Sequence, residues 1–207
     1  MDKKIILFDI DDTLIEVHRM SKMLYQQMAN KAGITLEEVV AAKERYKLTI
    51  EKTSDYKPDD LMVFVYHDLK TETSKQINPF AERKNYKESL FPEVKTVLEK
   101  LKKNYILGIF SEGFMEYQSD KIKLSGLNKF FDKNLIFIER RKTNPESIKK
   151  LPIGSIIVDD RKEVIEKLKQ AGSFKLIWIN RNTDETIKGV TTIRNFIELV
   201  DGSIIFS

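Results

Sequence analysis

Three carboxylates at the end of an apolar run are the residues of this sequence best suited to chemistry. The stretch "LFDIDDTLI" places Asp9, Asp11 and Asp12 directly after an apolar segment that begins at Ile5. Carboxylates this close repel one another, so the arrangement becomes tolerable when a cation neutralises them. Because the chain has no cysteine and only two histidines, we expect a hard divalent ion with oxygen ligands, Mg²⁺.

Polar residues also follow two other apolar runs. Ser111 follows "YILGIF", and Asp159, with Asp160 beside it, follows "SIIV". In an open parallel sheet, ligands bind beyond the carboxyl ends of the strands. We therefore expect Asp9, Ser111 and Asp159 to converge on one rim of a sheet.

The elements that must position these residues can be read from the hydrophobic pattern. Short apolar runs predict buried strands at residues 5–8, 105–110, 155–158 and 174–179, with a weaker one at 135–138. Helical patterns lie between them, one opened by Pro92 and another closed by Gly172. From about residue 90 onward, this alternation predicts a parallel α/β sheet built through right-handed crossovers.

Residues 15–90 have a different, helical pattern. Met20, Leu24 and Met28 recur at helical spacing before Gly33, and a capping box can begin the next helix at Thr35. The segment "KPDDLMVFVYHDL" suits either a helix or a strand, and we predict a helix because a proline and two aspartates favour a helix start. The sequence therefore predicts a helical, lid-like insertion directly after the first strand.

Four motifs, in order along nearly the whole chain, give a resemblance to a known family. They are "DIDDT" from Asp9 to Thr13, Ser111 in "GIFSEG", Lys142 in "RRKTNPESI", and Asp159 and Asp160 in "IIVDDRKEV". In these motifs the chain resembles the haloacid dehalogenase superfamily of phosphohydrolases. The resemblance implies a Rossmann-like parallel sheet flanked by helices (residues 1–14 and 91–207) and an inserted α-helical cap domain (residues 15–90).

The resemblance also implies roles. Asp9 would be the nucleophile and Asp11 the general acid and base, and the presence of Asp11 favours phosphoester hydrolysis over dehalogenation. Ser111, backbone N–H groups at Glu112 and Gly113, and the side chain of Lys142 would bind the phosphoryl group. Mg²⁺ would be held by the side chains of Asp9, Asp159 and Asp160 and by the backbone carbonyl of Asp11.

Two assignments stay open in the sequence. The proline that commonly follows the third-motif lysine is replaced by Thr143, and the segment to Asp159 is short, so Arg140 or Arg141 could take the place of Lys142. The second acid of the fourth motif could be Asp160 or Glu163, and we favour Asp160.

The predicted function is a Mg²⁺-dependent phosphatase for small phosphomonoesters, such as sugar phosphates or nucleotides. The alternatives are a phosphatase for a nucleic-acid end or another macromolecule, and a non-catalytic, phosphorylation-switched binding module. The net charge of +4 and the pI near 9.0 come from scattered basic residues, which disfavours nucleic acid. Without a membrane-length apolar stretch, a signal peptide or cysteine, we expect a cytoplasmic protein; the oligomeric state stays open.

Overall fold

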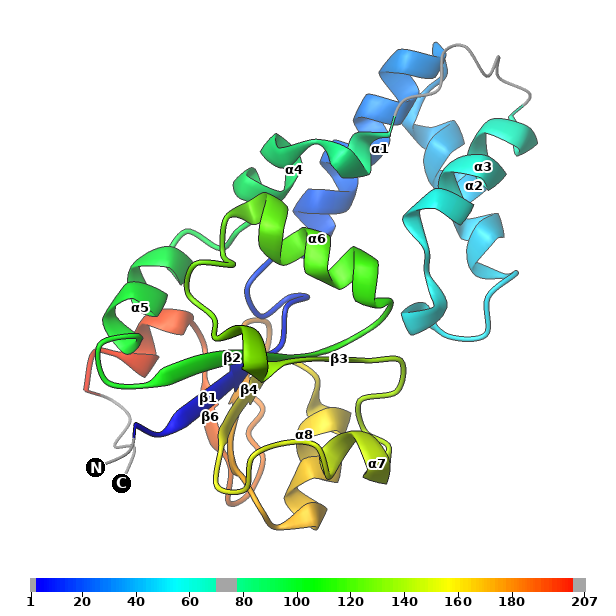
Figure 1. Cartoon of the computed structure of the whole chain (residues 1–207). Helices are drawn as coiled ribbons and strands as arrows, with labels where there is room; N and C mark the ends of the chain where they lie inside the picture. The colour runs from blue at the N-terminus through cyan, green and yellow to red at the C-terminus, as the bar shows by residue number, and fades with distance from the viewer. Residues whose placement is uncertain (1–2, 70–77, 203–207) are drawn as a thin grey trace.

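The computed structural model describes residues 3–69 and 78–202. Within them, six parallel strands form one sheet in the order β3-β2-β1-β4-β5-β6 (Figure 1). The strands are β1 (Ile5–Phe8), β2 (Ile106–Glu112), β3 (Ile136–Glu139), β4 (Ile156–Asp159), β5 (Lys175–Ile179) and β6 (Thr191–Ile193). The five predicted strands and their parallel pairing are confirmed. The edge strand β6 was not predicted, because a three-residue run with two threonines carries little hydrophobic signal.

Helices cover both faces of the sheet. On one face, Ile6 and Phe8 of β1 share a core with α5 (Val94–Leu101), α6 (Met115–Ser125) and η5 (Phe196–Leu199). On the other face, Leu7 and Ile157 pack with α7 (Pro145–Ile148) and α8 (Lys162–Ala171), below the sheet in Figure 1. This alternation along β1 is the two-residue period of a strand that is buried on both faces.

The segment between β1 and α5 is helical, as predicted. It contains α1 (Val17–Ala32), α2 (Leu36–Lys47), η1 (Thr53–Asp55), α3 (Pro58–Asp68), η3 (Pro79–Ala81) and α4 (Arg83–Glu88). We call residues 15–90 the insertion. Helices α2 and α3 pack together far from the sheet, whereas α4 lies against α6 (Figure 1).

The local sequence explains where these helices begin and end. Gly33 ends α1 with a positive φ of 71°, a conformation that costs glycine little. Thr35 and Glu38 form the predicted capping box: the Glu38 N–H donates to Thr35 Oγ1 at 3.1 Å, and the Thr35 N–H donates to Glu38 Oε2 at 2.7 Å. Helix α3 begins at Pro58, which confirms the helical interpretation of "KPDDLMVFVYHDL".

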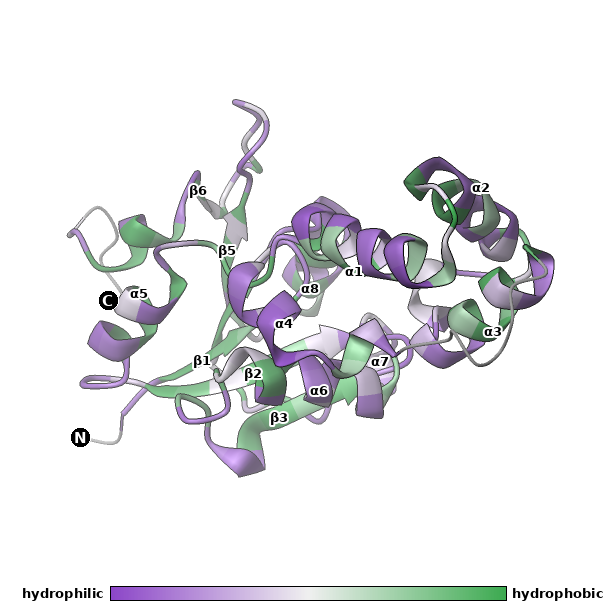
Figure 2. Cartoon of the chain, turned by 90° about the horizontal axis from the view of Figure 1, so that it is seen from above, coloured by the Kyte–Doolittle hydropathy of each residue, from purple (hydrophilic) through white to green (hydrophobic). Residues whose placement is uncertain are grey.

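The insertion shares its core with the rest of the molecule. Buried side chains run from the sheet through Leu14, Ile15 and Tyr86 into α1, where Met20 and Leu24 lie. In Figure 2 the central strands are hydrophobic, whereas the insertion helices carry hydrophilic turns on their outer surfaces. The division into domains at residues 15 and 90 stays a prediction.

The register of the sheet sets the position of the polar rim. Phe8 at the end of β1 is level with Ile109 of β2 and with Val158 of β4. The next backbone group, the Asp9 N–H, donates to the Val158 carbonyl at 2.9 Å. Asp9 and Asp159 therefore follow level positions on adjacent strands and emerge side by side.

Candidate active site

Lys142 lies at the centre of the rim. Its Nζ donates to Asp9 Oδ1 and to Asp159 Oδ2, both at 2.5 Å, and its side chain is 0% exposed. Although burial alone would lower the pKa of Lys142, the carboxylates of Asp159 and Asp9 raise it above its usual value. Lys142 is therefore a fixed cation in contact with the predicted nucleophile.

The two arginines that precede Lys142 bind elsewhere. Arg141 Nη1 donates to Ser54 Oγ at 2.8 Å, and Arg141 Nη2 to Asp55 Oδ2 at 2.9 Å. Arg140 also pairs with Asp55, and its guanidinium stacks on the Phe114 ring, with Cζ 3.4 Å from the ring centroid. The structure thus brings Lys142 to Asp9, while Arg140 and Arg141 connect the rim to the η1 turn of the insertion.

Two acids of the rim, Asp9 and Asp160, hold their protons unusually strongly. Burial, together with repulsion from Asp159 and Asp11, raises the pKa of Asp9 to about 6 despite the opposing charge of Lys142. Burial and repulsion from Asp9 and Asp159 raise the pKa of Asp160 to about 8. The rim therefore has more carboxylates than the nearby cations can stabilise in ionised form.

Asp160, rather than Glu163, is the fourth-motif acid that faces this site. Asp160 lines the same cleft as Asp9, and Thr13 Oγ1 donates to its Oδ1 at 3.5 Å. Glu163 lies on α8 with 67% of its side chain exposed, 3.7 Å from Arg161. The neighbouring Asp159 has both oxygens engaged, because Arg161 N–H donates to its Oδ1 at 2.9 Å and Lys142 to its Oδ2.

Asp11 is held by α6. Lys121 Nζ donates to both of its oxygens, at 2.6 and 2.7 Å, and Gln118 Nε2 donates to Oδ2 at 3.1 Å. Lys121 is only 2% exposed, and its ammonium lies 4.2 Å from the centroid of the Tyr117 ring. Neither partner could be predicted from the sequence, because α6 has no motif that distinguishes them from ordinary helical residues.

The predicted phosphoryl-binding residues lie at the end of β2. Ser111 is 1% exposed, and its hydroxyl has no hydrogen-bond partner within the part of the chain that the structure describes. An unpartnered buried hydroxyl is costly unless a ligand bonds to it. Glu112 lines the cleft, and its carboxylate accepts from Arg161 at 2.5 Å.

The role expected of the Gly113 N–H needs a correction. This N–H donates to the Glu139 carbonyl at 2.9 Å and so extends the pairing of β2 with β3. It is therefore already engaged. Gly113 nevertheless lines the cleft with a φ of 145°, and a Cβ at this position would lie 2.8 Å from Gln118 Nε2. Its lack of a side chain makes room for the amide that holds Asp11.

Asp12 is a turn residue rather than a member of the acid cluster around Lys142. It has a positive φ of 53°, which aspartate tolerates better than most residues. Its Oδ1 accepts from the Val17 N–H at 2.9 Å and so caps the first turn of α1.

The four predicted metal-binding acids do not form a ready-made set of side-chain ligands. Among residues 3–69 and 78–202, no three Asp, Glu or His side chains surround a common point as metal ligands do. Lys142 lies between Asp9 and Asp159, and the Asp11 carboxylate is bound to Lys121. The chemistry still fits a hard cation, because the donors are oxygens and the raised pKa values of Asp9 and Asp160 mark uncompensated negative charge.

The rim opens into a cleft of about 370 Å³ between the sheet and the insertion. The core contributes the acids, Ser111 and Arg161; the insertion contributes Lys43 and Lys47 of α2. Aromatic side chains line the space between them, namely Tyr25, Tyr56, Phe114 and Tyr117. The sequence does not distinguish these residues, because tyrosine and lysine at helical spacing have the same pattern in a core or on a solvated face.

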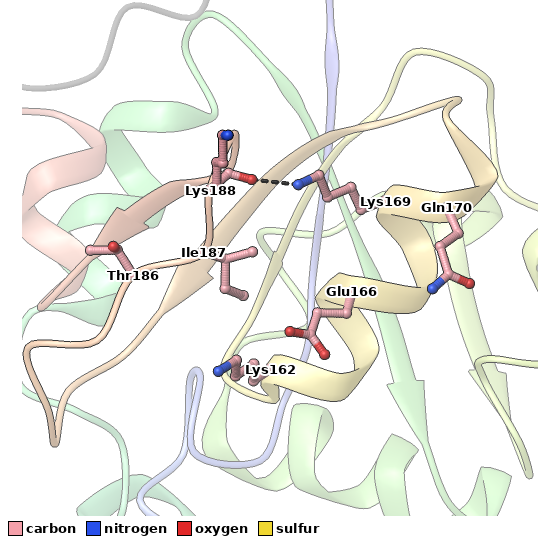
Figure 3. A pocket seen from close by; sticks show the side chains of 7 residues that line it. All are labelled: Lys162, Glu166, Lys169, Gln170, Thr186, Ile187 and Lys188. Atoms are coloured by element: carbon pink, nitrogen blue, oxygen red, sulfur yellow. Dashed lines mark hydrogen bonds between the residues drawn. The ribbon is translucent and has the colours of Figure 1, made fainter.

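A second hollow, shown in Figure 3, lies elsewhere. It is formed by α8 and the loop before β6, and Lys162, Glu166, Lys169 and Ile187 are among its lining residues. Lys169 Nζ donates to the Lys188 carbonyl across it. None of the motif residues lines this hollow.

Comparison with known families identifies the class of protein. A model of the haloacid dehalogenase-like hydrolase family matches residues 3–151. Since the match spans more than half of the chain, this protein belongs to that family and is an enzyme of the hydrolase class. A comparison with curated proteins gives no significant match.

Solved structures support the fold. A HAD phosphatase from Thermococcus onnurineus is 24% identical, with 95% of each chain covered and a TM-score of 0.65. YfnB from Bacillus subtilis, described as a HAD-hydrolase and solved bound to magnesium, is 16% identical, with 96% of this chain and 97% of that chain covered and a TM-score of 0.63. A 2-haloacid dehalogenase from Pseudomonas syringae pv. Tomato DC3000 is 19% identical, with 96% of each covered and a TM-score of 0.61. At these identities the likeness shows the fold alone.

No helix in the described residues combines the length and the apolar character that crossing a membrane requires.

Proposed function

We propose that this hydrolase is a Mg²⁺-dependent phosphatase that cleaves small phosphomonoesters through an aspartyl-phosphate on Asp9. The observation that carries the proposal is the second carboxylate, Asp11, in the same cleft as Asp9. Cleavage of a phosphoester requires a proton for the departing oxygen, which a departing halide does not need. A phosphatase resembling the one from Thermococcus onnurineus is therefore favoured over a dehalogenase.

In the first step, an Asp9 carboxylate oxygen attacks phosphorus, and the bond between phosphorus and the ester oxygen breaks. Asp11, which carries a proton when the substrate is bound, gives that proton to the leaving oxygen. In the second step, Asp11 takes a proton from water as that water attacks phosphorus, which releases phosphate and restores Asp9. Lys121 and Gln118 orient the Asp11 carboxylate for both transfers.

The phosphoryl group is a dianion, so its approach to Asp9 must be made favourable. Lys142 supplies positive charge from within the site, and the Ser111 hydroxyl is free to donate to a phosphoryl oxygen. Mg²⁺, held by the Asp9 and Asp160 carboxylates and the Asp11 carbonyl with Asp159 beside them, would neutralise further charge on the phosphate.

We propose that the insertion serves as the cap of this site. The cleft volume of about 370 Å³ lies at the small end of ligand pockets, which favours a metabolite over a macromolecule. Contacts from Arg140 and Arg141 to the η1 turn hold the insertion over the rim. A closed cap would shield the aspartyl-phosphate from bulk water.

The test is turnover of p-nitrophenyl phosphate with Mg²⁺ by the wild type and by Asp9→Asn. We expect Asp9→Asn to abolish phosphate release, because an amide is a far weaker nucleophile, while the asparagine oxygen can still accept from Lys142. Asp12→Asn is the matched control, because asparagine keeps the turn conformation and the cap of α1. Undiminished turnover by Asp9→Asn would refute the proposal.

A further inference from the structure

The wall of the cleft opposite the acids carries positive charge. Lys43 and Lys47 lie one turn apart on α2 and both line the cleft that contains Asp9 and Ser111. Residues four apart on a helix project from the same face. The cleft is therefore bounded by the phosphoryl site on the core side and by a pair of ammonium groups on the insertion side.

Among the residues that the structure describes, this pair of lysines shares a single carboxylate. Both ammonium groups bond to the same carboxylate, that of Glu44, at 2.6 Å from Lys43 and 3.1 Å from Lys47. The Lys43 side chain is only 18% exposed, and burial lowers its pKa. Two cations that share one exposed carboxylate leave a net positive charge at the cleft wall, which an incoming anion would neutralise.

Aromatic rings separate the lysine pair from the rim acids. Tyr56 and Tyr117 are 5.9 Å apart between ring centroids, and Tyr25 lines the same space. Burial raises the pKa values of all three hydroxyls, so they stay neutral. The cleft thus has an anion-binding end at the rim, an amphipathic middle and a cationic far end.

From this arrangement we infer that the substrate is a phosphomonoester with a second anionic group, a carboxylate or a phosphate, at its opposite end, and that Lys43 and Lys47 bind this group. The inference rests on the proposed function and narrows its substrate class. A substrate of this kind would meet opposite charge at both ends, whereas a neutral sugar or nucleoside would leave the lysine pair unmatched.

The experiment compares two matched pairs of ligands, whose members differ by one anionic group. Glycerol 3-phosphate and 3-phosphoglycerate test a carboxylate; fructose 6-phosphate and fructose 1,6-bisphosphate test a second phosphate. Dissociation constants are measured by calorimetry with Mg²⁺ in the Asp9→Asn protein, so that no ligand is consumed. In at least one pair, we expect the more anionic member to bind about 10- to 100-fold more tightly, as for a charge-assisted hydrogen bond.

Variants of the lysine pair locate the effect. In Lys43→Met/Lys47→Met, which keeps the aliphatic stems, the preference for the more anionic member should be lost; in Lys43→Arg/Lys47→Arg it should persist. Lys22→Met/Lys31→Met, at two exposed lysines of α1 outside the cleft lining, is the charge-matched control and should keep the preference.

Equal affinities within both pairs, no binding of the more anionic members, or a preference that survives the double methionine variant would each overturn this inference. None of these results touches the proposed function, which wild-type turnover of p-nitrophenyl phosphate decides separately. The absence of that turnover would overturn the function.

Discussion

Three consecutive basic residues of one loop form ion pairs in opposite environments. Lys142 is fully buried between Asp9 and Asp159. Arg141, one residue earlier, pairs with Asp55 where 26% and 20% of the two side chains remain exposed. The loop therefore makes a buried contact within the rim and a solvent-accessible contact with the insertion.

The two kinds of contact differ in how much it costs to break them. A buried charge that loses its partner has no water to replace it, so the Lys142 contacts are expensive to break. Exposed ion pairs gain little and are screened by salt, so the Arg140 and Arg141 contacts can open and close at small cost. In the proposed function, a fixed charge at the phosphoryl site and a movable cap would require these two kinds of contact.

Replacement of Lys142 should have the largest effect. Lys142→Met leaves Asp9 and Asp159 buried without their shared cation, so we expect the unfolding free energy to fall by about 3–5 kcal/mol. We also expect the phosphatase activity to be lost. Urea unfolding without metal measures the first, and p-nitrophenyl phosphate turnover the second. Lys150→Met, at an exposed lysine nearby in the chain, is the control. If Lys142→Met were as stable as the wild type, the claim that the buried Lys142 contacts are expensive to break would be wrong.

Lys121 of α6 forms a second ion pair in which the lysine is buried, with Asp11. Lys121→Met should lower kcat/KM about 10²-fold for alkyl phosphates, because Asp11 loses the partner that orients it and acid–base catalysis is worth about 10²–10⁴ in rate. The loss should be smaller for p-nitrophenyl phosphate, whose leaving group needs little protonation. Lys123→Met, two residues on and exposed, should behave as wild type. An equal loss for both substrates would exclude this positioning role.

The sheet and the convergence of its rim could be predicted because both follow from short-range signals. A run such as Ile5–Phe8 marks a buried strand by composition, and parallel pairing then requires Asp9 and Asp159 to emerge at one edge. Helix ends were also readable, because Gly33 and Thr35 act within one turn. By contrast, β6 could not be predicted, because its three residues carry little signal of their own and form a strand by pairing with β5.

The partners of the acids could not be predicted, because they depend on packing between distant segments. Lys121 reaches Asp11 across 110 residues, and Arg141 reaches Asp55 across 86. A lysine on a helix has the same local pattern whether it faces water or a carboxylate. The engagement of the Gly113 N–H by Glu139 likewise depends on how far β2 and β3 pair.

The pH dependence of stability should separate the rim from the exposed contacts. The folded pKa values of Asp9, about 6, and Asp160, about 8, exceed the ordinary value of 3.8. Their contribution without metal is therefore fully present below pH 3.8 and is lost as pH rises through about 6 and then 8, with a slope of up to about 1.4 kcal/mol per pH unit for each proton.

Added Mg²⁺ should oppose this loss, because metal ligands must be ionised. We expect the gain in unfolding free energy from Mg²⁺, relative to a chelator, to grow from about pH 5 to about pH 9. Urea titrations across this range measure it. A gain that is the same at both ends would exclude metal binding by Asp9 and Asp160.

Loss of the partly exposed ion pairs with Asp55 should have the smallest effect. Asp55→Asn removes the carboxylate that Arg140 and Arg141 share, and because these side chains are partly solvated, we expect no resolvable change in the urea midpoint. The Michaelis constant should rise several-fold, since the insertion closes less often over bound substrate. In the wild type, added salt should raise the Michaelis constant by screening these pairs, and in Asp55→Asn this salt dependence should weaken. If Asp55→Asn unfolds at lower urea with unchanged kinetics, the arginine contacts stabilise the fold and leave the cap unaffected. The ion pairs of Arg140 and Arg141 would then differ from those of Lys142 only in how much they stabilise the fold.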